Sequence, residues 1–138
     1  MGQGDPPEQT GVGWLGAEDD EPKNDVVVVF IPSKTREDQP IDHVYWRDEA
    51  IRVMSHVFEG GATAMEGTGG WLDKEHGGQV QIEAVSIVVS FIAEGEWDEE
   101  AALQLRRFLH RMGREANQGE VAVYAKGQLR RIRRYDND

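Results

Sequence analysis

The chain has 138 residues, enough for one modest hydrophobic core, and carries a net charge of −11. It contains no cysteine, which excludes disulfides, thiolate metal sites and cysteine nucleophiles. Its longest apolar runs fall far short of the roughly 20 residues that a membrane helix needs, and the N-terminus lacks a signal-peptide pattern. We therefore expect a single cytoplasmic domain without membrane contact.

The negative charge is unevenly spread along the chain. Residues 1–25 hold seven acids and one base, residues 26–97 hold twelve and five, and residues 98–138 hold seven and nine. The overall charge argues against indiscriminate nucleic-acid binding. The C-terminal part nevertheless allows a local basic surface.

Residues 1–25 are rich in glycine, proline and acidic side chains and show no periodicity, so we expect a disordered acidic tail. Trp14 and Leu15 form an apolar pair in these acidic surroundings. The pair is a candidate docking motif for a protein partner. The alternatives are a segment that folds back onto the domain and a tail without a specific role.

The first two elements of the domain follow from their apolar patterns. Residues 26–31, "VVVVFI", are apolar at every position, which is typical of an interior strand covered on both faces. Apolar residues at helical spacing predict a helix over about 41–58, with Pro40 in its first turn. Gly60 and Gly61 end that helix.

The rest of the chain predicts a hairpin, a helix and a final strand. Residues 62–73 and 79–93 should pair antiparallel, because a Gly-Gly pair at 77–78 separates two strand-like runs. A second helix follows, with acids in its first turn at 98–100 and arginines later, as the helix dipole favours. Residues 120–125 read as another strand, and a turn extends it into 129–133.

The predicted order is therefore β-α-β-β-α-β over residues 26–134, with a C-terminal tail at 135–138. This order is typical of the α+β ferredoxin-like fold, in which an antiparallel sheet carries two helices on one face. Because the first strand is apolar on both sides, the open face of the sheet needs a cover. A homodimer formed through that face would supply one.

The stretch "GGATAMEGTGGW" at residues 60–71 has five glycines around Glu66. It lacks the lysine of a phosphate-binding loop and leads into no helix, so a nucleotide-binding role is rejected. Glycines within a strand mark a bulge or bend, and we expect a kinked edge strand here. Glu66 and Trp71 remain candidate site residues, since such a kink can bring a ligand close to the backbone.

A second group of candidates is polar. Glu83 lies on an apolar strand face, where a carboxylate must be paired, hydrogen-bonded or functional, and a salt bridge or an exposed strand end would also explain it. Arg114 and Gln118 follow in the connection from the second helix to the last strand, where capping would account for them, with Asn117 or Gly119 left-handed. Arg114 could reach Glu83 or Glu66 and close a polar pocket.

We expect no metal and no cofactor. The four histidines lack the spacing of metal-binding helices and should lie on the surface or on helix faces; they are His43, His56, His76 and His110. Ser86 and Ser90 lie in a strand without a nucleophile elbow.

Arginines gather near the C-terminus. They form a stripe on the second helix and a run after it, and the candidate basic surface comprises Arg106, Arg107, Arg111, Arg130 and Arg131. Such stripes bind phosphates in some proteins, but a solvated face paired with the acidic tail explains them as well.

Several separate motifs resemble a set of small uncharacterised prokaryotic proteins. They are F-x-GGAT at 58–63, G-x-GGW-x-D at 67–73, the strand glutamate Glu83, and GRE-x-NQ-x-EVAV at 113–123. The resemblance spans about residues 26–133 and supports a single domain without implying an activity. It also implies a shared site of Trp71, Glu83, Arg114 and Gln118.

Three functions remain open at this point. The first is a binding or accessory protein that acts through partner contacts as a homodimer. The second is a small enzyme with a pocket of Glu66, Glu83, Arg114 and Gln118, in which a carboxylate is a general base and the arginine stabilises negative charge. The third is a nucleic-acid-associated factor that uses the arginine stripe.

Overall fold

The computed structural model describes residues 10–16 and 22–137. Within them the chain forms strands β1 (Asp25–Pro32), β2 (Thr63–Asp73), β3 (Gln79–Ile92), β4 (Val121–Ala125) and β5 (Gln128–Ile132). The α-helices of this part are α1 (His43–Val57) and α2 (Glu99–Glu115), and 3₁₀ helices lie at Val12–Leu15 and Lys74–His76. Residues 1–9 and 17–21 of the predicted disordered tail lie outside the described residues.

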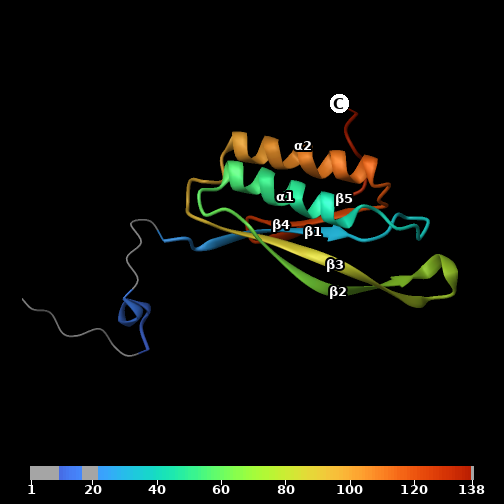
Figure 1. Cartoon of the computed structure of the whole chain (residues 1–138), viewed down its shortest axis with the longest axis horizontal. Coiled ribbons are helices and arrows are strands. Elements are labelled where there is room, and N and C mark those ends of the chain that lie inside the picture. The colour runs from blue at the N-terminus through green and yellow to red at the C-terminus, as the bar shows by residue number, and fades with distance from the viewer. Residues whose placement is uncertain (1–9, 17–21, 138) are drawn as a thin grey trace, which may run out of the picture.

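The described strands form one antiparallel sheet in the order β2-β3-β1-β4-β5. As predicted, β1 is interior and pairs with β3 on one side and β4 on the other. α1 and α2 lie on the same face of this sheet (Figure 1), so the predicted ferredoxin-like arrangement is confirmed. β5, the predicted extension, adds an edge strand beside β4.

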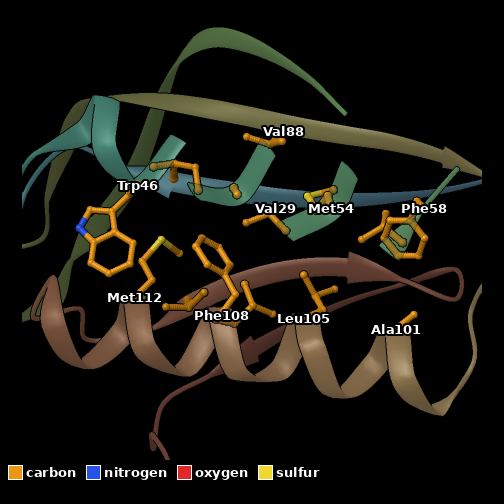
Figure 2. Close-up of a cluster of buried hydrophobic side chains, with 14 of the residues drawn as sticks. Val29, Trp46, Met54, Phe58, Val88, Ala101, Leu105, Phe108 and Met112 are labelled. Carbon is orange, nitrogen blue, oxygen red and sulfur yellow. The ribbon is translucent and has the colours of Figure 1, made fainter. Parts of the chain in front are cut away.

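The hydrophobic core lies between α1, α2 and the sheet. Alternate residues of β1, namely Val27, Val29 and Ile31, are fully buried on the helix side. Figure 2 shows side chains of α2, among them Phe108 and Met112, meeting the strands and α1 in this layer. Burying these apolar groups supplies most of the driving force for folding.

Aspartates fix where the helices begin. The Asp42 carboxylate accepts a hydrogen bond from the Tyr45 amide at 3.1 Å, and Asp98 accepts one from the Ala101 amide at 2.8 Å. These N-caps satisfy backbone donors that the helix leaves unpaired. Pro40 does not occupy the first turn of α1 as predicted, because it precedes the Asp42 cap and forms an isolated β-bridge with Lys34.

The glycine-rich stretch is an edge strand, but it contains no bulge. β2 pairs with β3 without interruption, from Thr63 opposite Val89 to Asp73 opposite Gln79. The predicted kink is therefore wrong. A Cβ on Gly67 would stand 3.4 Å from Ile87 Cδ1, which is an ordinary contact distance within the paired strands.

The β2–β3 hairpin extends beyond the rest of the sheet (Figure 1). β3 pairs with β1 only from Val85 onward, so its earlier residues pair with β2 alone. The predicted turn is confirmed, since Gly77 and Gly78 have φ angles of 82° and 72°. Only glycine adopts that left-handed conformation readily.

The domain continues past residue 134. The Tyr135 ring packs against the core, and its hydroxyl donates to the Gln118 carbonyl at 3.0 Å. The Asp136 amide donates to His110 Nδ1 at 2.7 Å. These two residues thus belong to the fold and not to a tail. Neither α1 nor α2, the α-helices of the described chain, is long and apolar enough to cross a bilayer.

Candidate active site

A polar cluster joins the edge of the sheet to the first turn of α1. Glu66 of β2 and Ser86 of β3 are directly opposite each other in the strand register, on the face that the helices cover. His43 begins α1 just after the Asp42 cap, and Arg47 follows one turn later. Residues four apart share a face of a helix, so both side chains reach the same part of β2.

Hydrogen bonds connect three of these side chains in series. The Ser86 hydroxyl lies 2.8 and 2.9 Å from the two Glu66 carboxylate oxygens. His43 Nε2 lies 2.5 Å from the Ser86 oxygen and 3.4 Å from Glu66 Oε2. On the other side of the ring, Nδ1 lies 2.9 Å from the Pro32 carbonyl oxygen, to which it donates.

The Ser86 hydroxyl links the imidazole ring to the carboxylate. It has one proton to donate, and both Glu66 oxygens and His43 Nε2 lie within hydrogen-bond distance of its oxygen. When Ser86 donates to Glu66, its oxygen is left to accept from His43. The three side chains therefore form one connected hydrogen-bonded group.

Glu66 is the most exposed member of the cluster. Hydrogen bonding from Ser86 is the main cause that lowers the pKa of Glu66 from its ordinary value of 4.5, and His43 and Arg47 add to the effect. The Glu66 side chain is 60 % exposed, whereas Ser86 is fully buried. The arrangement therefore presents an ionised carboxylate to solvent, and the buried hydroxyl positions it.

The five residues predicted as one pocket do not gather around this cluster. Glu83 belongs to the opposite face of β3 from Ser86, because side chains alternate along a strand, and it accepts from the Ser33 amide and hydroxyl at 3.3 and 3.2 Å. Trp71 is 54 % exposed on the projecting part of the β2–β3 hairpin. Of the predicted set, Glu66 is the one that lies in the cluster.

Arg114 and Gln118 lie at the end of α2. Arg114 donates to the Asp136 carbonyl oxygen, and the buried Gln118 amide donates to the Lys34 carbonyl at 2.7 Å. Asn117, at φ 51°, is the left-handed residue after α2; the sequence predicted either Asn117 or Gly119 for this role. Gln118 and Glu83 thus both hold residues of the β1–α1 connection, and this connection leads to His43.

The sequence analysis missed His43, Ser86 and Arg47 as site residues. His43 and His110 lie on helices, as expected, but each is largely buried and hydrogen-bonded. The available signal was Ser86 itself, a hydroxyl on the buried face of an apolar strand opposite a glutamate. To recognise that Ser86 faces Glu66, one needs the exact pairing of β2 with β3. The predicted turn fixes that pairing only to within a few residues.

The predicted basic surface is partly neutralised within the fold. Arg111 donates to Glu49 at 2.8 Å and to the Tyr45 hydroxyl at 2.9 Å, and its guanidinium lies 4.9 Å from the Trp46 ring centroid. It therefore joins α1 to α2 and is not part of an open stripe. Ion pairs also link Arg106 to Asp136 and Arg131 to Glu120, while Arg107 and Arg130 are exposed.

A hollow of about 470 Å³ lies away from the cluster. It is formed by the last turn of α1 and the first turn of α2, and Val53, His56 and Gln104 are among its lining residues. Its residues are separate from Glu66, so it provides no enclosure for that carboxylate. The cluster itself faces solvent at the edge of β2.

Comparison with solved structures gives two similar folds. One is a phage SAM lyase in complex with S-methyl-5'-thioadenosine, with a TM-score of 0.58 and 13 % identity over 79 % of this chain and 88 % of that one. The other is a phage SAM lyase in its apo state, with a TM-score of 0.52 and 12 % identity over 82 % and 91 % of the two chains. No protein-family model and no curated protein matches the chain. At this identity the likeness shows a shared fold.

Proposed function

We propose that the protein is a small enzyme whose substrate-binding group is the Glu66 carboxylate. The observation that carries this proposal is the contrast within the cluster: the carboxylate is 60 % exposed, while Ser86, which holds it, is fully buried. A carboxylate held by the Ser86 hydroxyl, which lies within 2.9 Å of both of its oxygens, and open to solvent is preorganised to bind donor groups of a ligand. Ser86 and His43 act as positioning residues.

The lowered pKa of Glu66 also indicates which role it takes. A general base works best when its pKa lies near the working pH, so a carboxylate with a lowered pKa is a weak base. The general-base role suggested by the sequence therefore suits Glu66 poorly. An ionised carboxylate instead suits hydrogen-bond donors such as ribose hydroxyls or an ammonium group.

The structural neighbours support a particular substrate class. Two solved structures of phage SAM lyase share this fold across most of both chains, and one of these structures contains S-methyl-5'-thioadenosine. S-adenosylmethionine carries ribose hydroxyls, an ammonium group and a positive sulfonium, all of which complement a carboxylate. We therefore assign the chain the cleavage of S-adenosylmethionine to S-methyl-5'-thioadenosine. In that step the bond from sulfur to Cγ of the amino-acid chain breaks and sulfur keeps the electron pair, while an oxygen of the substrate's own carboxylate bonds to Cγ, so that the chain leaves as homoserine lactone.

The same chemistry limits where Glu66 sits relative to sulfur. The positive charge on sulfur disappears as the bond breaks, so a carboxylate touching sulfur would stabilise the substrate more than the transition state. Glu66 therefore acts on the donor groups of the substrate, away from the reacting sulfur. Losing it should raise KM more than it lowers kcat.

The test is incubation of the full chain with S-adenosylmethionine, with S-methyl-5'-thioadenosine measured by liquid chromatography and mass spectrometry. We expect product from the wild type and a loss of tenfold or more in kcat/KM for Glu66→Gln, mainly through KM. Glu94→Gln is the matched control, because Glu94 is exposed and lies outside the cluster. Absence of product together with absence of S-methyl-5'-thioadenosine binding, or equal kinetics for the two variants, would contradict the proposal.

The hypothesis of a homodimer draws on a different observation. The sheet face away from α1 and α2 is apolar, and Met65, Phe91 and Leu129 on it are 52 %, 59 % and 49 % exposed. Contiguous apolar surface of this kind marks an interaction site. We infer that a second copy covers it, and the protein contacts proposed from the sequence would then be contacts between copies.

A further inference from the structure

A groove runs between α2 and the β4–β5 hairpin. It has a volume of about 560 Å³, and residues of α2, β4 and β5, the strands at one edge of the sheet, line it. Its floor is apolar: Trp97, Val123, Ala125 and Ile132 line it, and each is only partly buried. This groove is separate from the Glu66 cluster on the opposite edge of the sheet.

The rim of this groove is basic. Lys126, Arg130 and Arg134 line it. Arg130 is opposite Val123 in the strand register, so its side chain starts on the same face as the apolar floor. Arg106 and Arg131 also line the groove, where Arg106 forms an ion pair with Asp136 and Arg131 forms one with Glu120. An occupant of matching chemistry would be acidic and would carry a few apolar side chains.

The N-terminal segment of the chain has this chemistry. Residues 1–25 hold seven acids and one base, with the run Glu-Asp-Asp-Glu at 18–21. A few positions earlier, Trp14 and Leu15 belong to the 3₁₀ helix Val12–Leu15 and are 54 % and 73 % exposed. The segment thus carries a large apolar pair beside a dense acidic run.

The segment also enters the fold next to the groove. Val28 of β1 is opposite Tyr124 of β4, and the strands are antiparallel, so Asp25 lies beside the β4–β5 turn at Lys126 and Gly127. Trp14 is eleven residues before Asp25, which allows a span of up to about 40 Å of extended chain. α2 has 17 residues and is roughly 25 Å long, so Trp14 can reach any point of the groove.

We propose that the N-terminal segment binds in this groove of its own domain. In the described structure Trp14 and Leu15 are exposed and do not line the groove. In the proposed bound state they occupy its apolar floor, and the acidic run pairs with Lys126, Arg130 and Arg134. Attachment to β1 gives the segment an effective concentration of the order of millimolar at the groove, so weak contacts suffice. The segment therefore competes with any external anion for these cations.

A nucleic acid is the alternative occupant, and the observations favour the segment. Phosphates would use the basic rim but not the apolar floor, and a chain with a net charge of −11 repels a polyanion overall. The segment matches both parts of the groove. Its binding also accounts for a basic surface in an acidic protein without an external partner.

The test uses the full chain, whose lack of cysteine allows one label to be placed at a chosen site. A nitroxide on Thr10→Cys, an exposed position beside the apolar pair, should broaden the amide NMR signals of residues 123–132 and leave those of β2 sharp. Raising the salt from about 20 mM to about 500 mM should weaken the broadening, because it screens the ion pairs. Lys126→Glu with Arg130→Glu should abolish it.

Two controls separate the possible outcomes. Lys74→Glu reverses an exposed charge on the β2–β3 turn, far from the groove, and should leave the broadening unchanged. A second sample mixes spin-labelled chains without isotope label with isotope-labelled chains that carry no nitroxide. The amide signals of the isotope-labelled chains should then show no broadening if each segment binds its own domain. Broadening in the mixture would overturn binding within one chain. If the amide signals of residues 123–132 were not broadened by the nitroxide but shifted on addition of a single-stranded oligonucleotide, the groove would be a nucleic-acid site and the proposal would be wrong.

Discussion

Glu66 and Glu96 show how similar electrostatics serve different roles. The pKa of each is lowered from its ordinary value of 4.5 by hydrogen bonds, mainly from Ser86 in one case and the Ala93 amide in the other. The Glu96 side chain is only 17 % exposed, and it accepts from the Ala93 and Glu59 amides at 2.7 and 2.8 Å. Glu96 therefore fixes the fold, whereas the exposed Glu66 can bind a ligand.

Glu96→Gln should lower the free energy of unfolding by about 1–2 kcal/mol at pH 7, because a charged acceptor of backbone amides and of Lys23 is lost. The folded-state pKa of Glu96 is depressed, so its contribution is present above pH 4.5 and is lost as the pH falls through the folded-state pKa. Urea unfolding at pH 7 and at about pH 3.5 should show the gap between wild type and variant narrowing with acid. Glu94→Gln is the control, with a change within about 0.5 kcal/mol. A gap that stays constant across this range would contradict the assignment.

The residue scale is also where the sequence was least informative. Glu66 was a candidate because of the glycines around it in the sequence. Ser86 and His43, however, are 43 positions apart, and they meet because α1 begins after the Asp42 cap, close to the paired strands β2 and β3. Arg114 was proposed to reach Glu83 or Glu66, yet it donates to the Asp136 carbonyl oxygen because the C-terminal segment folds back along α2. Such contacts depend on tertiary placement, which local patterns do not contain.

At the scale of elements the sequence was more informative. The apolar run of β1, the Gly77–Gly78 turn and the stripe of α2 each follow from local physics, and each is present in the structure. The glycines of β2 were misread as a bulge because glycine in a strand often marks one. The register is uninterrupted, and a Cβ at Gly67, Gly69 or Gly70 would stand 3.4 to 3.7 Å from its nearest neighbour, which is ordinary contact.

Gly113 is a close-contact glycine within a helix. A Cβ at this position would overlap the Tyr135 ring, which packs against α2 and hydrogen-bonds to the Gln118 carbonyl. Gly113→Ala should therefore lower stability by about 1–3 kcal/mol, as overpacking generally does, despite the better helix propensity of alanine. In a Tyr135→Ala background the same change should raise stability by about 0.5–1 kcal/mol.

This reversal of sign can be measured as a double-mutant cycle by thermal or urea unfolding. Tyr135→Ala alone provides the matched background, since it removes the ring without changing α2. If Gly113→Ala changed the free energy of unfolding equally in both backgrounds, the effect of Gly113 would not depend on its contact with the Tyr135 ring. The result would also decide whether residues 135–136 belong to the folded domain in solution.

At the scale of the whole molecule, the open face of the sheet presents exposed apolar side chains from β2, β3 and β5. Strand pairing places Met65, Ile87 and Phe30 in one row across this face, and Val89, Val28, Tyr124 and Leu129 in another. β5 continues the sheet sideways and does not fold over this face. The apolar residues on both sides of β1 predicted from the sequence that this face would need a cover. The structure shows which residues of the other strands share the face with β1.

Phe91→Glu tests whether a second copy covers the open face. Phe91 is 59 % exposed, so the fold should tolerate the change, which circular dichroism can verify. A stable interface removes roughly 800 Å² from each partner, and a charge buried at such a surface is costly. Light scattering should report twice the chain mass of 15.5 kDa for the wild type and the single mass for Phe91→Glu. Leu103→Glu, which alters an exposed apolar residue of α2, should remain a dimer. A wild type that is monomeric at about 50 μM would exclude a standard homodimer, and the apolar face would then have to be covered by a different protein.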